Sequence, residues 1–192
     1  MTEEDAALVK AFQAGDKAAF DRIVLKHKDN LFNLVYWYLN DYQQANDCAQ
    51  EIFIKVFKNL KQFRFESAFS TWLYKIAANT CKNVLKSATY KWGKKTVPLE
   101  NPRGSKAQNP AHEIPDAGPS PANGLERKER LMLIQEAINS LPEEQNQVVV
   151  LRDIQGLSYD EIAEITGMKP GTIKSRLARG RLELRNRLEG KV

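Results

Sequence analysis

Aromatic and basic side chains are interleaved between residues 63 and 83, in the segment FRFESAFSTWLYKIAANTCKN. Single-stranded DNA offers each base as a stacking face, worth about 1–3 kcal/mol on an aromatic ring, and its phosphates attract cations. A hydrophobic core is the alternative place for such rings, above all for Trp72 and at least one Phe. The pattern leaves both interpretations open for its candidate residues, which are Arg64, Phe65, Phe69, Trp72, Tyr74, Lys75 and Lys82.

A second group of chemically useful residues lies in SYDEIAEITGMKPGTIKSRLARGRLELRNR, residues 158 to 187. Ser158 and Glu161 form the pattern of a capping box, residues 167–169 suit a tight turn, and Pro170 suits the first position of a helix. This is the layout of a helix-turn-helix. At about 100° per residue, one face of the second helix is apolar and should pack on the first helix. That face consists of Ile173, Leu177, Gly180, Leu184 and Leu188. Its expected partners on the first helix are Ile162, Ala163 and Ile165.

The opposite face of the second helix carries Lys174, Ser175, Ala178 and Arg179 near its N-terminus. A short polar group and two cations there suit a helix laid in the major groove of DNA. The flanks, where phosphates would be reached, carry Arg176, Arg181 and Arg187. An Arg-rich amphipathic surface helix is the alternative, and Leu182 does not fit a purely polar outer face. The motif indicates DNA binding, which repressors and activators share.

The charge distribution supports a nucleic-acid partner. The net charge is only +5, but residues 55–95 hold ten basic side chains and one acid, and residues 169–187 hold seven and one. Two separate basic segments are typical of nucleic-acid binding, although solvated helix faces are the simpler alternative.

Metal and redox chemistry have little support in the sequence. The two cysteines, Cys48 and Cys81, form no CxxC pair, and the two histidines, His27 and His112, lie far apart. Buried free thiols are therefore expected, with no metal or cofactor. The N-terminal sequence lacks the features of a signal peptide, and the longest aliphatic run, residues 148–151, is too short to cross a bilayer. The sequence predicts a cytoplasmic protein.

The elements that must position these residues are helices. Six of the eight prolines fall between residues 92 and 124, which predicts a flexible linker. On both sides the apolar residues recur at helical spacing, so we expect an all-α protein with two small domains, 1–91 and 125–192. The first should hold four helices, beginning after Asp16 and near residues 31, 48 and 71. In the second, capping boxes at Ser140 and Ser158 mark helix starts, and Gly156 and Gly167 mark helix ends.

Two segments resemble a known family. DCAQEIFIKVFKNLKQFRFESAFSTWLYKIAANTCKN is similar to region 2 of the extracytoplasmic-function sigma factors, nearest the sigma-E and sigma-W type. LPEEQNQVVVLRDIQGLSYDEIAEITGMKPGTIKSRLARGRLELRNRL is similar to their region 4. The resemblance covers both predicted domains in the family's order. It implies a subunit that recruits RNA polymerase core to promoters, with 1–91 as region 2 and 125–192 as region 4.

The resemblance also implies three sets of site residues. The surface that docks on the beta-prime coiled coil of the polymerase corresponds to Asp47, Gln50, Glu51 and Phe53. The loop and helix that receive a flipped base of the minus-10 element and contact its backbone correspond to Arg64, Phe65, Ser67, Phe69, Trp72, Tyr74, Lys75, Asn79 and Lys82. The positions that meet the minus-35 element correspond to Thr172, Lys174, Ser175, Arg176, Ala178, Arg179 and Arg181.

Regulation by a partner is a further implication of the resemblance, because these sigma factors are held inactive by membrane-anchored anti-sigma factors in envelope stress responses. A 33-residue flexible linker has an end-to-end distance of about 30 Å. Fully extended it reaches about 110 Å, so it can span two promoter elements about 55 Å apart. We therefore expect two mobile domains in the unbound protein.

Two other classes of protein remain as alternatives. A transcriptional regulator with a ligand-sensing N-terminal domain would need a ligand pocket and a dimerisation helix. A nucleic-acid enzyme would need clustered metal ligands, or a base and a nucleophile. The isolated histidines and scattered carboxylates form no such group, so the sequence predicts no catalysis.

Overall fold

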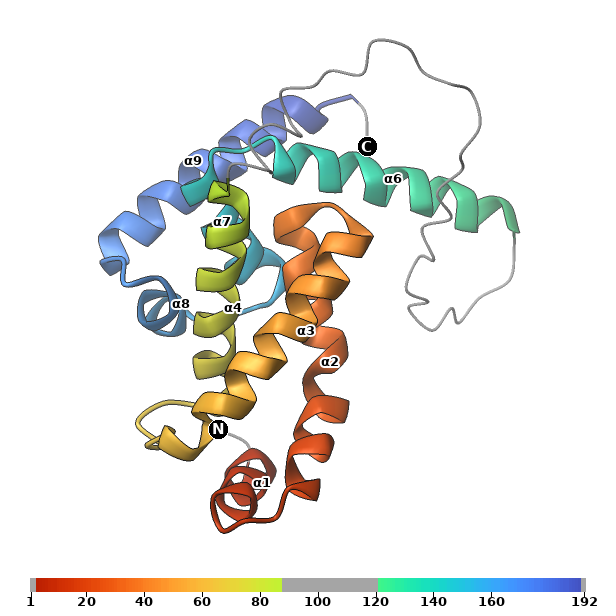
Figure 1. Ribbon diagram of the computed structural model, residues 1–192. Coiled ribbons are helices and arrows are strands. Elements are labelled where there is room, and N and C mark those ends of the chain that lie inside the picture. The colour runs from red at the N-terminus through yellow and green to blue at the C-terminus, as the bar shows by residue number, and fades with distance from the viewer. Residues whose placement is uncertain (1–2, 88–120, 191–192) are drawn as a thin grey trace.

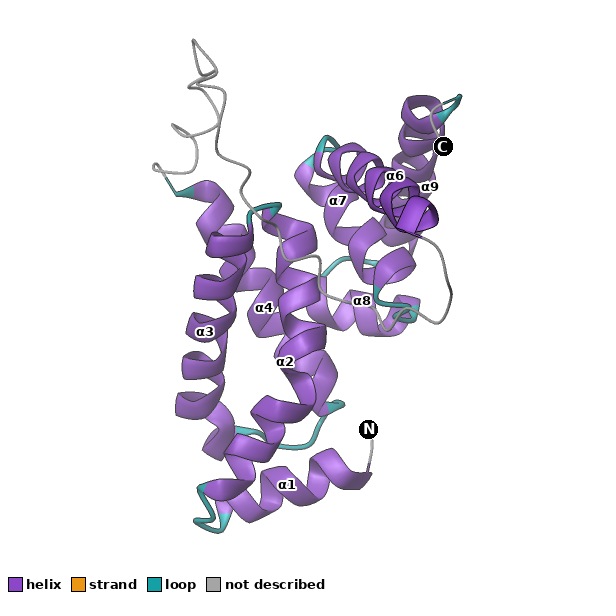
Figure 2. Ribbon diagram, turned by 90° about the vertical axis from the view of Figure 1, so that its right-hand side faces the viewer, coloured by secondary structure: helices purple, strands orange, loops and turns teal. Residues whose placement is uncertain are grey.

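The computed structural model describes residues 3–87 and 121–190, with side chains for 3–87 and 129–190 (Figure 1). Within these ranges every regular element is helical (Figure 2), which confirms the all-α prediction. The first half contains α1 (Glu3–Gln13), α2 (Ala18–Leu39), α3 (Tyr42–Asn59), the short 3₁₀ turn η1 (Leu60–Gln62) and α4 (Phe69–Lys86). The second contains α6 (Pro121–Asn139), α7 (Glu143–Val149), the π-helical turn η2 (Val150–Ile154), α8 (Tyr159–Thr166) and α9 (Pro170–Leu188). Most of the predicted linker lies outside the described residues, and α6 begins before residue 125.

The helices of the first half are divided differently from the sequence prediction. Asp16 lies one residue before Lys17, the N-cap of α2, and its Oδ1 accepts a hydrogen bond of 2.9 Å from the Ala18 amide. That helix, α2, then runs without a break to Leu39, where two helices were expected. It contains no Gly or Pro. Each further residue therefore adds a backbone hydrogen bond to the helix without the free-energy cost of a helix breaker. The fourth helix is instead α1, which buries Leu8, Val9 and Phe12.

Helix ends in the second half follow the local sequence in one place and not in another. The capping box of Ser158 and Glu161 is present, and Gly167 ends α8 with a φ of 71°. The capping box predicted at Ser140 is wrong, because α7 begins after Pro142. The Ser140 hydroxyl instead donates to the carbonyl oxygen of Ala137 at 2.6 Å. Ser140 therefore belongs to the end of α6 rather than to the start of α7.

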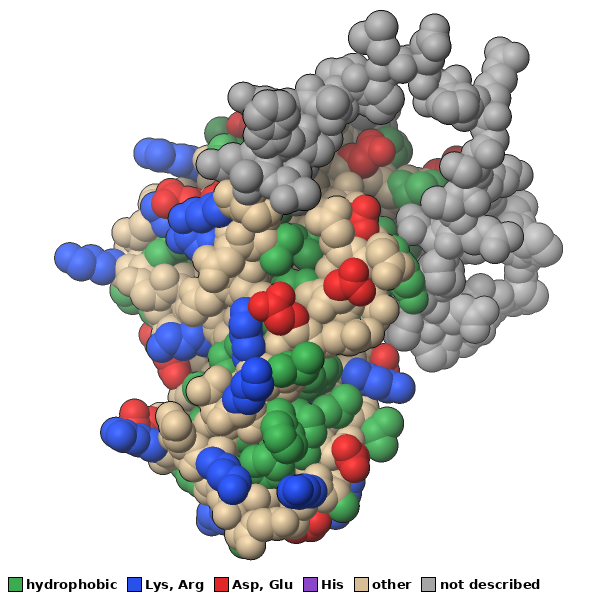
Figure 3. Space-filling model, in the orientation of Figure 1, with side chains coloured by type: hydrophobic (Ala, Val, Ile, Leu, Met, Phe, Trp, Pro, Cys, Tyr) green, Lys and Arg blue, Asp and Glu red, His purple; other side chains and the backbone are tan. Residues whose placement is uncertain are grey.

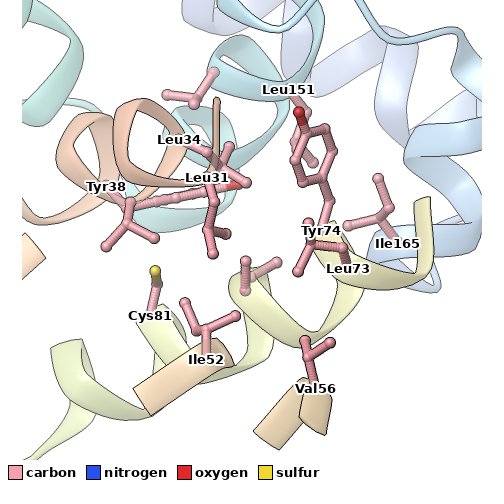
Figure 4. Packing of buried hydrophobic residues seen from close by; sticks show 14 of the residues in the cluster. Leu31, Leu34, Tyr38, Ile52, Val56, Leu73, Tyr74, Cys81, Leu151 and Ile165 are labelled. Carbon is pink, nitrogen blue, oxygen red and sulfur yellow. The ribbon is translucent and has the colours of Figure 1, made fainter. Parts of the chain in front are cut away.

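The two halves pack directly on each other. Helix α8 lies against α4, while α6 and η2 lie against α2 (Figures 1 and 2). Leu151 and Ile165 of the second half lie beside Leu73 and Tyr74 of the first, in one continuous hydrophobic cluster (Figure 4). We refer to this contact between the halves as the seam. It differs from the expectation of two independently mobile domains, because the burial of apolar side chains from both halves favours their association.

Two tyrosines place their hydroxyls in the seam. Tyr38 donates to the carbonyl oxygen of Gln147, and Tyr74 to Oε1 of Gln155, each at 3.5 Å. Burial raises the pKa of Tyr38 well above its usual value and also raises the pKa of Tyr74. Both phenols therefore stay neutral and act as donors. At this distance the bonds are weak, so the apolar contacts contribute most of the seam's stability.

The two cysteines lie in the core of the first half, as predicted. Cys48 of α3 and Cys81 of α4 are both free and buried. A hydrogen bond with the Cys48 thiol, together with burial, raises the pKa of Cys81 well above its usual value. The Cys81 thiol therefore stays protonated and acts as a small apolar side chain.

Candidate nucleic-acid interface

The loop between η1 and α4 is built around Phe65, which has a φ of 58°. A left-handed conformation is unusual for an aromatic residue and costs about 1–3 kcal/mol, so neighbouring contacts must hold it. The Phe65 ring packs on the Phe63 ring at a centroid distance of 5.0 Å. The Lys10 ammonium also contacts the Phe65 ring and lies 5.7 Å from its centroid. The loop therefore presents a half-buried aromatic ring, supported by a core ring and by a cation.

The four aromatic candidates divide into core and surface residues. Phe69 is 0% exposed and Tyr74 is 7% exposed, so both belong to the hydrophobic core. Phe65 and Trp72 are half-buried. Trp72 packs on Phe63 with ring centroids 5.2 Å apart. Among the four, only Phe65 and Trp72 have a ring that is partly accessible to a DNA base. Phe69 and Tyr74 are core residues, which was the alternative to base stacking.

A polar row runs along the outer face of α4. Lys75, Asn79 and Lys82 are all exposed and recur at helical spacing, while Leu73 and Ala77 face the core. Arg64 in the preceding loop is exposed, and Ser67 is half-buried. Two cations around an amide can contact phosphates and one base edge. On the face shown in Figure 3, Lys and Arg side chains are spread over α9, over α4 and over the part of the first half that lies below α4 in this view.

Helix α9 has the two faces that its sequence predicts. Ile173, Leu177 and Gly180 are buried against α7 and α8. The outward residues of its first half are all exposed, namely Lys174, Ser175, Ala178 and Arg179. Thr172 is half-buried, and Leu182 is the exposed apolar residue that the helical angles indicate. The N-terminal part of α9 is therefore open to a major groove.

All three flanking arginines have partners within the protein, and Arg187 pairs with Glu183 of the same helix at 2.9 Å. The Arg176 guanidinium lies 2.5 Å from a Glu144 carboxylate oxygen and 2.8 Å from the Met168 sulfur. Arg181 makes a two-point contact with the Asp153 carboxylate, at 3.1 and 2.5 Å, which raises the pKa of Arg181. The ion pairs of Arg176 and Arg181 tie α9 to α7 and η2. Because such partly exposed pairs contribute little to stability, both of these guanidiniums can exchange them for phosphates.

Gly180 lies at a close contact between α9 and α7, and a substitution there tests this packing. A Cβ atom on Gly180 would lie 2.8 Å from Cγ2 of Val149. We expect Gly180→Ala to destabilise the second half by about 1–3 kcal/mol, because overpacking outweighs the better helix propensity of alanine. The measurement is the thermal unfolding midpoint.

Gly171 is the matched control for Gly180, since a Cβ atom there meets nothing within 4 Å. Gly171→Ala should leave the midpoint unchanged or raise it. If both variants melt at the same temperature, Val149 can turn away and the close contact does not constrain α9.

Helix α3 exposes an acidic and apolar face. Asp47, Gln50 and Glu51 are exposed, and Phe53 is half-buried. Glu51 pairs with Lys55 at 2.6 Å. At about 100° per residue, Ile54 shares the face of Asp47 and Glu51, and it is 54% exposed. A single exposed apolar side chain is common on protein surfaces, so only its position beside Asp47 and Glu51 makes Ile54 a candidate for the docking face. The sequence analysis missed Ile54, although its place one turn from Gln50 and Glu51 could have indicated it.

Other classes of site have no support among the described residues. No group of three or more His, Cys, Asp or Glu side chains in that part of the chain could hold a metal ion. No helix within the described ranges is long and apolar enough to cross a membrane.

Comparison with known proteins agrees with this architecture. Residues 23–90 match the family described as Sigma-70 region 2, and residues 131–184 match Sigma-70, region 4. The RNA polymerase sigma-H factor of Pseudomonas aeruginosa is 37% identical over 179 residues, which cover 93% of this chain and 91% of that protein. The ECF RNA polymerase sigma-E factor of Escherichia coli (strain K12) is 34% identical over 185 residues, covering 96% and 94%.

Two solved structures share the fold. CnrH, in complex with the cytosolic domain of CnrY, superposes with a TM-score of 0.70 at 20% identity, covering 99% of this chain and 100% of that one. The sigma factor RpoE, in complex with the anti-sigma factor NepR from Bartonella quintana, has a TM-score of 0.66 at 23% identity, covering 90% and 98%. With both family regions in order and relatives matched over nearly their full length, this chain belongs to the sigma-70 family, among the extracytoplasmic-function sigma factors that direct RNA polymerase to promoters.

Proposed function

We propose that this chain binds RNA polymerase core through α3 and reads promoter DNA through two surfaces. The loop before α4, together with the outer row of α4, takes the minus-10 element as an unpaired strand. The outward face of α9 takes the minus-35 element in the major groove. The chain carries out no catalysis itself and acts in the cytoplasm.

One observation carries this proposal. The outward residues Lys174, Ser175, Ala178 and Arg179 of α9 are all exposed, while Ile173, Leu177 and Gly180 on its apolar face are buried and Leu184 and Leu188 are half-buried. A helix that keeps two cations and a small hydroxyl outward at its N-terminal end, on a rigid support, has the geometry of a recognition helix. The exposed row of Lys75, Asn79 and Lys82 on α4 supports a second contact with DNA.

The direct test is run-off transcription with purified core polymerase and genomic DNA fragments. Added to core, the chain should produce transcripts from promoters that core alone does not use. A ligand-sensing regulator would bind DNA without converting core polymerase into a promoter-specific enzyme, so the absence of new start sites would reject the proposal.

The polymerase contact has its own test. Asp47 and Glu51 lie one turn apart on an exposed face, and reversing both to Lys should weaken core binding by about 100-fold, because like charges then face a basic partner. The measurement is a pull-down with core polymerase, with circular dichroism as the check on folding. The matched control is Asp21→Lys with Asp29→Lys, which makes the same change of charge on the exposed surface of α2. If both double variants lose the same affinity for core polymerase, the change in net charge explains the loss and α3 is not the docking face.

We also propose an anti-sigma partner, anchored in the membrane, that holds this chain inactive as part of an envelope stress response. Two proteins with this fold were solved with a bound partner: CnrH with the cytosolic domain of CnrY, and the sigma factor RpoE with the anti-sigma factor NepR. The cytosolic part of a membrane protein encoded beside this chain should inhibit run-off transcription when added in equimolar amount. Undiminished transcription in its presence would exclude that protein as the regulator.

A further inference from the structure

Helix α1 precedes the residues matched by Sigma-70 region 2, yet it contacts the start of the loop before α4. The side-chain amide of Gln13 donates two hydrogen bonds, to the carbonyl oxygens of Leu60 at 3.1 Å and of Phe63 at 2.9 Å. Both amide hydrogens are therefore used on backbone atoms about 50 residues away. Because the bonds go to backbone carbonyls, they constrain the path of the chain rather than one side chain.

Helix α1 also reaches the other end of the same loop. The buried Asp5 carboxylate lies 3.0 Å from Nε2 of His27, and both side chains are less than a tenth exposed. The His27 ring packs edge-on against Phe69, the first residue of α4, at a centroid distance of 5.2 Å. The loop is thus fixed to α1 directly where it begins and through His27 where it ends.

Between these two ends the loop holds Phe65 in its left-handed conformation. A residue in such a conformation stays there only when its surroundings over-determine it. The exposed Lys10 of α1 lies over the Phe65 ring. Two bonds of α1 thus hold the backbone on one side of Phe65, and Lys10 of the same helix contacts the Phe65 ring.

We propose that Gln13 is a positioning residue for the minus-10 loop. The inference rests on the proposed role of that loop in binding unpaired DNA. Gln13 holds the carbonyls of Leu60 and Phe63 so that Phe65 and the neighbouring Arg64 are already in place when the strand arrives. Without its two donors the loop spreads over other conformations, and the affinity for DNA falls with the fraction that remains competent.

Gln13→Glu is the sharpest variant, because it keeps the shape of the side chain and turns the donor into an acceptor facing two carbonyls. In holoenzyme with core polymerase, we expect a fluorescent single-stranded oligonucleotide of the non-template minus-10 sequence to bind about tenfold more weakly. Affinity for core polymerase should not change. Asn30→Asp, the same change from amide to carboxylate at an exposed site on α2, is the matched control and should bind DNA like the wild type.

A double-mutant cycle separates positioning from packing. Gly adopts a positive φ without strain, so in a Phe65→Gly background the strained residue is gone and Gln13→Glu should have little further effect on DNA binding. Gln13→Lys, which keeps hydrogen-bond donors, should bind within about threefold of the wild type. If Gln13→Glu and Gln13→Lys lose thermal stability and DNA affinity in parallel, Gln13 is only a packing residue and the proposal is wrong.

The same experiment distinguishes this inference from the proposed function. If wild-type holoenzyme does not bind the oligonucleotide, the role of the loop itself is wrong. If the wild type binds and Gln13→Glu binds equally well, the loop keeps its role and the positioning role of Gln13 is rejected.

Discussion

Phe69→Ala should lower the free energy of unfolding of the first half by about 3–5 kcal/mol, the usual cost of truncating a fully buried phenylalanine. Phe69 is 0% exposed, and its ring packs against Phe63, Trp72 and His27. Such a loss is a third or more of the stability of many domains. The measurement is guanidinium unfolding followed by tryptophan fluorescence, where the midpoint should fall.

Trp72→Ala is the informative comparison for Phe69→Ala. Trp72 is half-buried, so its removal should cost less stability while weakening the binding of unpaired minus-10 DNA by about 1–3 kcal/mol. If instead Phe69→Ala unfolds at the wild-type midpoint and fails to bind DNA, Phe69 is a stacking platform and the assignment to the core is wrong.

Lys174→Glu combined with Arg179→Glu should abolish binding to the minus-35 element, with a loss of about 100- to 1,000-fold. Both side chains are exposed on the outward face of α9. The variant replaces two attractions to the DNA by two repulsions, and each close pair of like charges costs several kcal/mol. Binding to a minus-35 duplex at several salt concentrations measures the effect, because the salt dependence should also decrease.

Arg185→Glu is the control for the α9 variant. Arg185 is exposed on the same helix but lies in its last turn, away from the outward residues at the N-terminal end. Its reversal should weaken binding by less than about tenfold, through long-range charge alone. A larger loss at Arg185 than at the paired site would mean that the DNA lies along the other end of α9.

The sequence was most informative where local signals and the hydrophobic pattern agree. In α8 and α9 the capping box, the turn glycine, the helix-opening proline and the apolar face all indicate the same geometry, and the structure has it. At Ser140 a local pattern was misleading, because a serine and a glutamate three residues apart can also belong to a helix end followed by Pro142. A capping box depends on backbone geometry that the residue types alone do not fix.

The parts that could not be predicted depend on contacts between distant segments. Helix α1 has an apolar pattern in Leu8, Val9 and Phe12 that could have identified it as a helix. Its contact with Leu60 and Phe63 could not be inferred, because Gln13 is an ordinary polar residue in the sequence. Similarly, the period of α4 places Tyr74 about 100° from the core residue Leu73, and it does not show that the second half covers this side of the helix.

The seam also links the two DNA-reading surfaces energetically. Helix α8 packs against both α4 and α9, and the axes of packed helices lie about 8–10 Å apart, so where α8 lies between them α4 and α9 are no more than about 20 Å apart. Promoter elements about 55 Å apart along the duplex cannot be reached at this separation, and the seam must open before both are bound. Each surface is exposed while the seam is closed, so the first promoter element is bound without opening it. The free energy of opening is spent when the second element is bound, so the two contacts are coupled unfavourably although the halves no longer touch. A mutation that weakens the seam should leave the affinity for each element alone unchanged and raise the affinity for DNA that carries both.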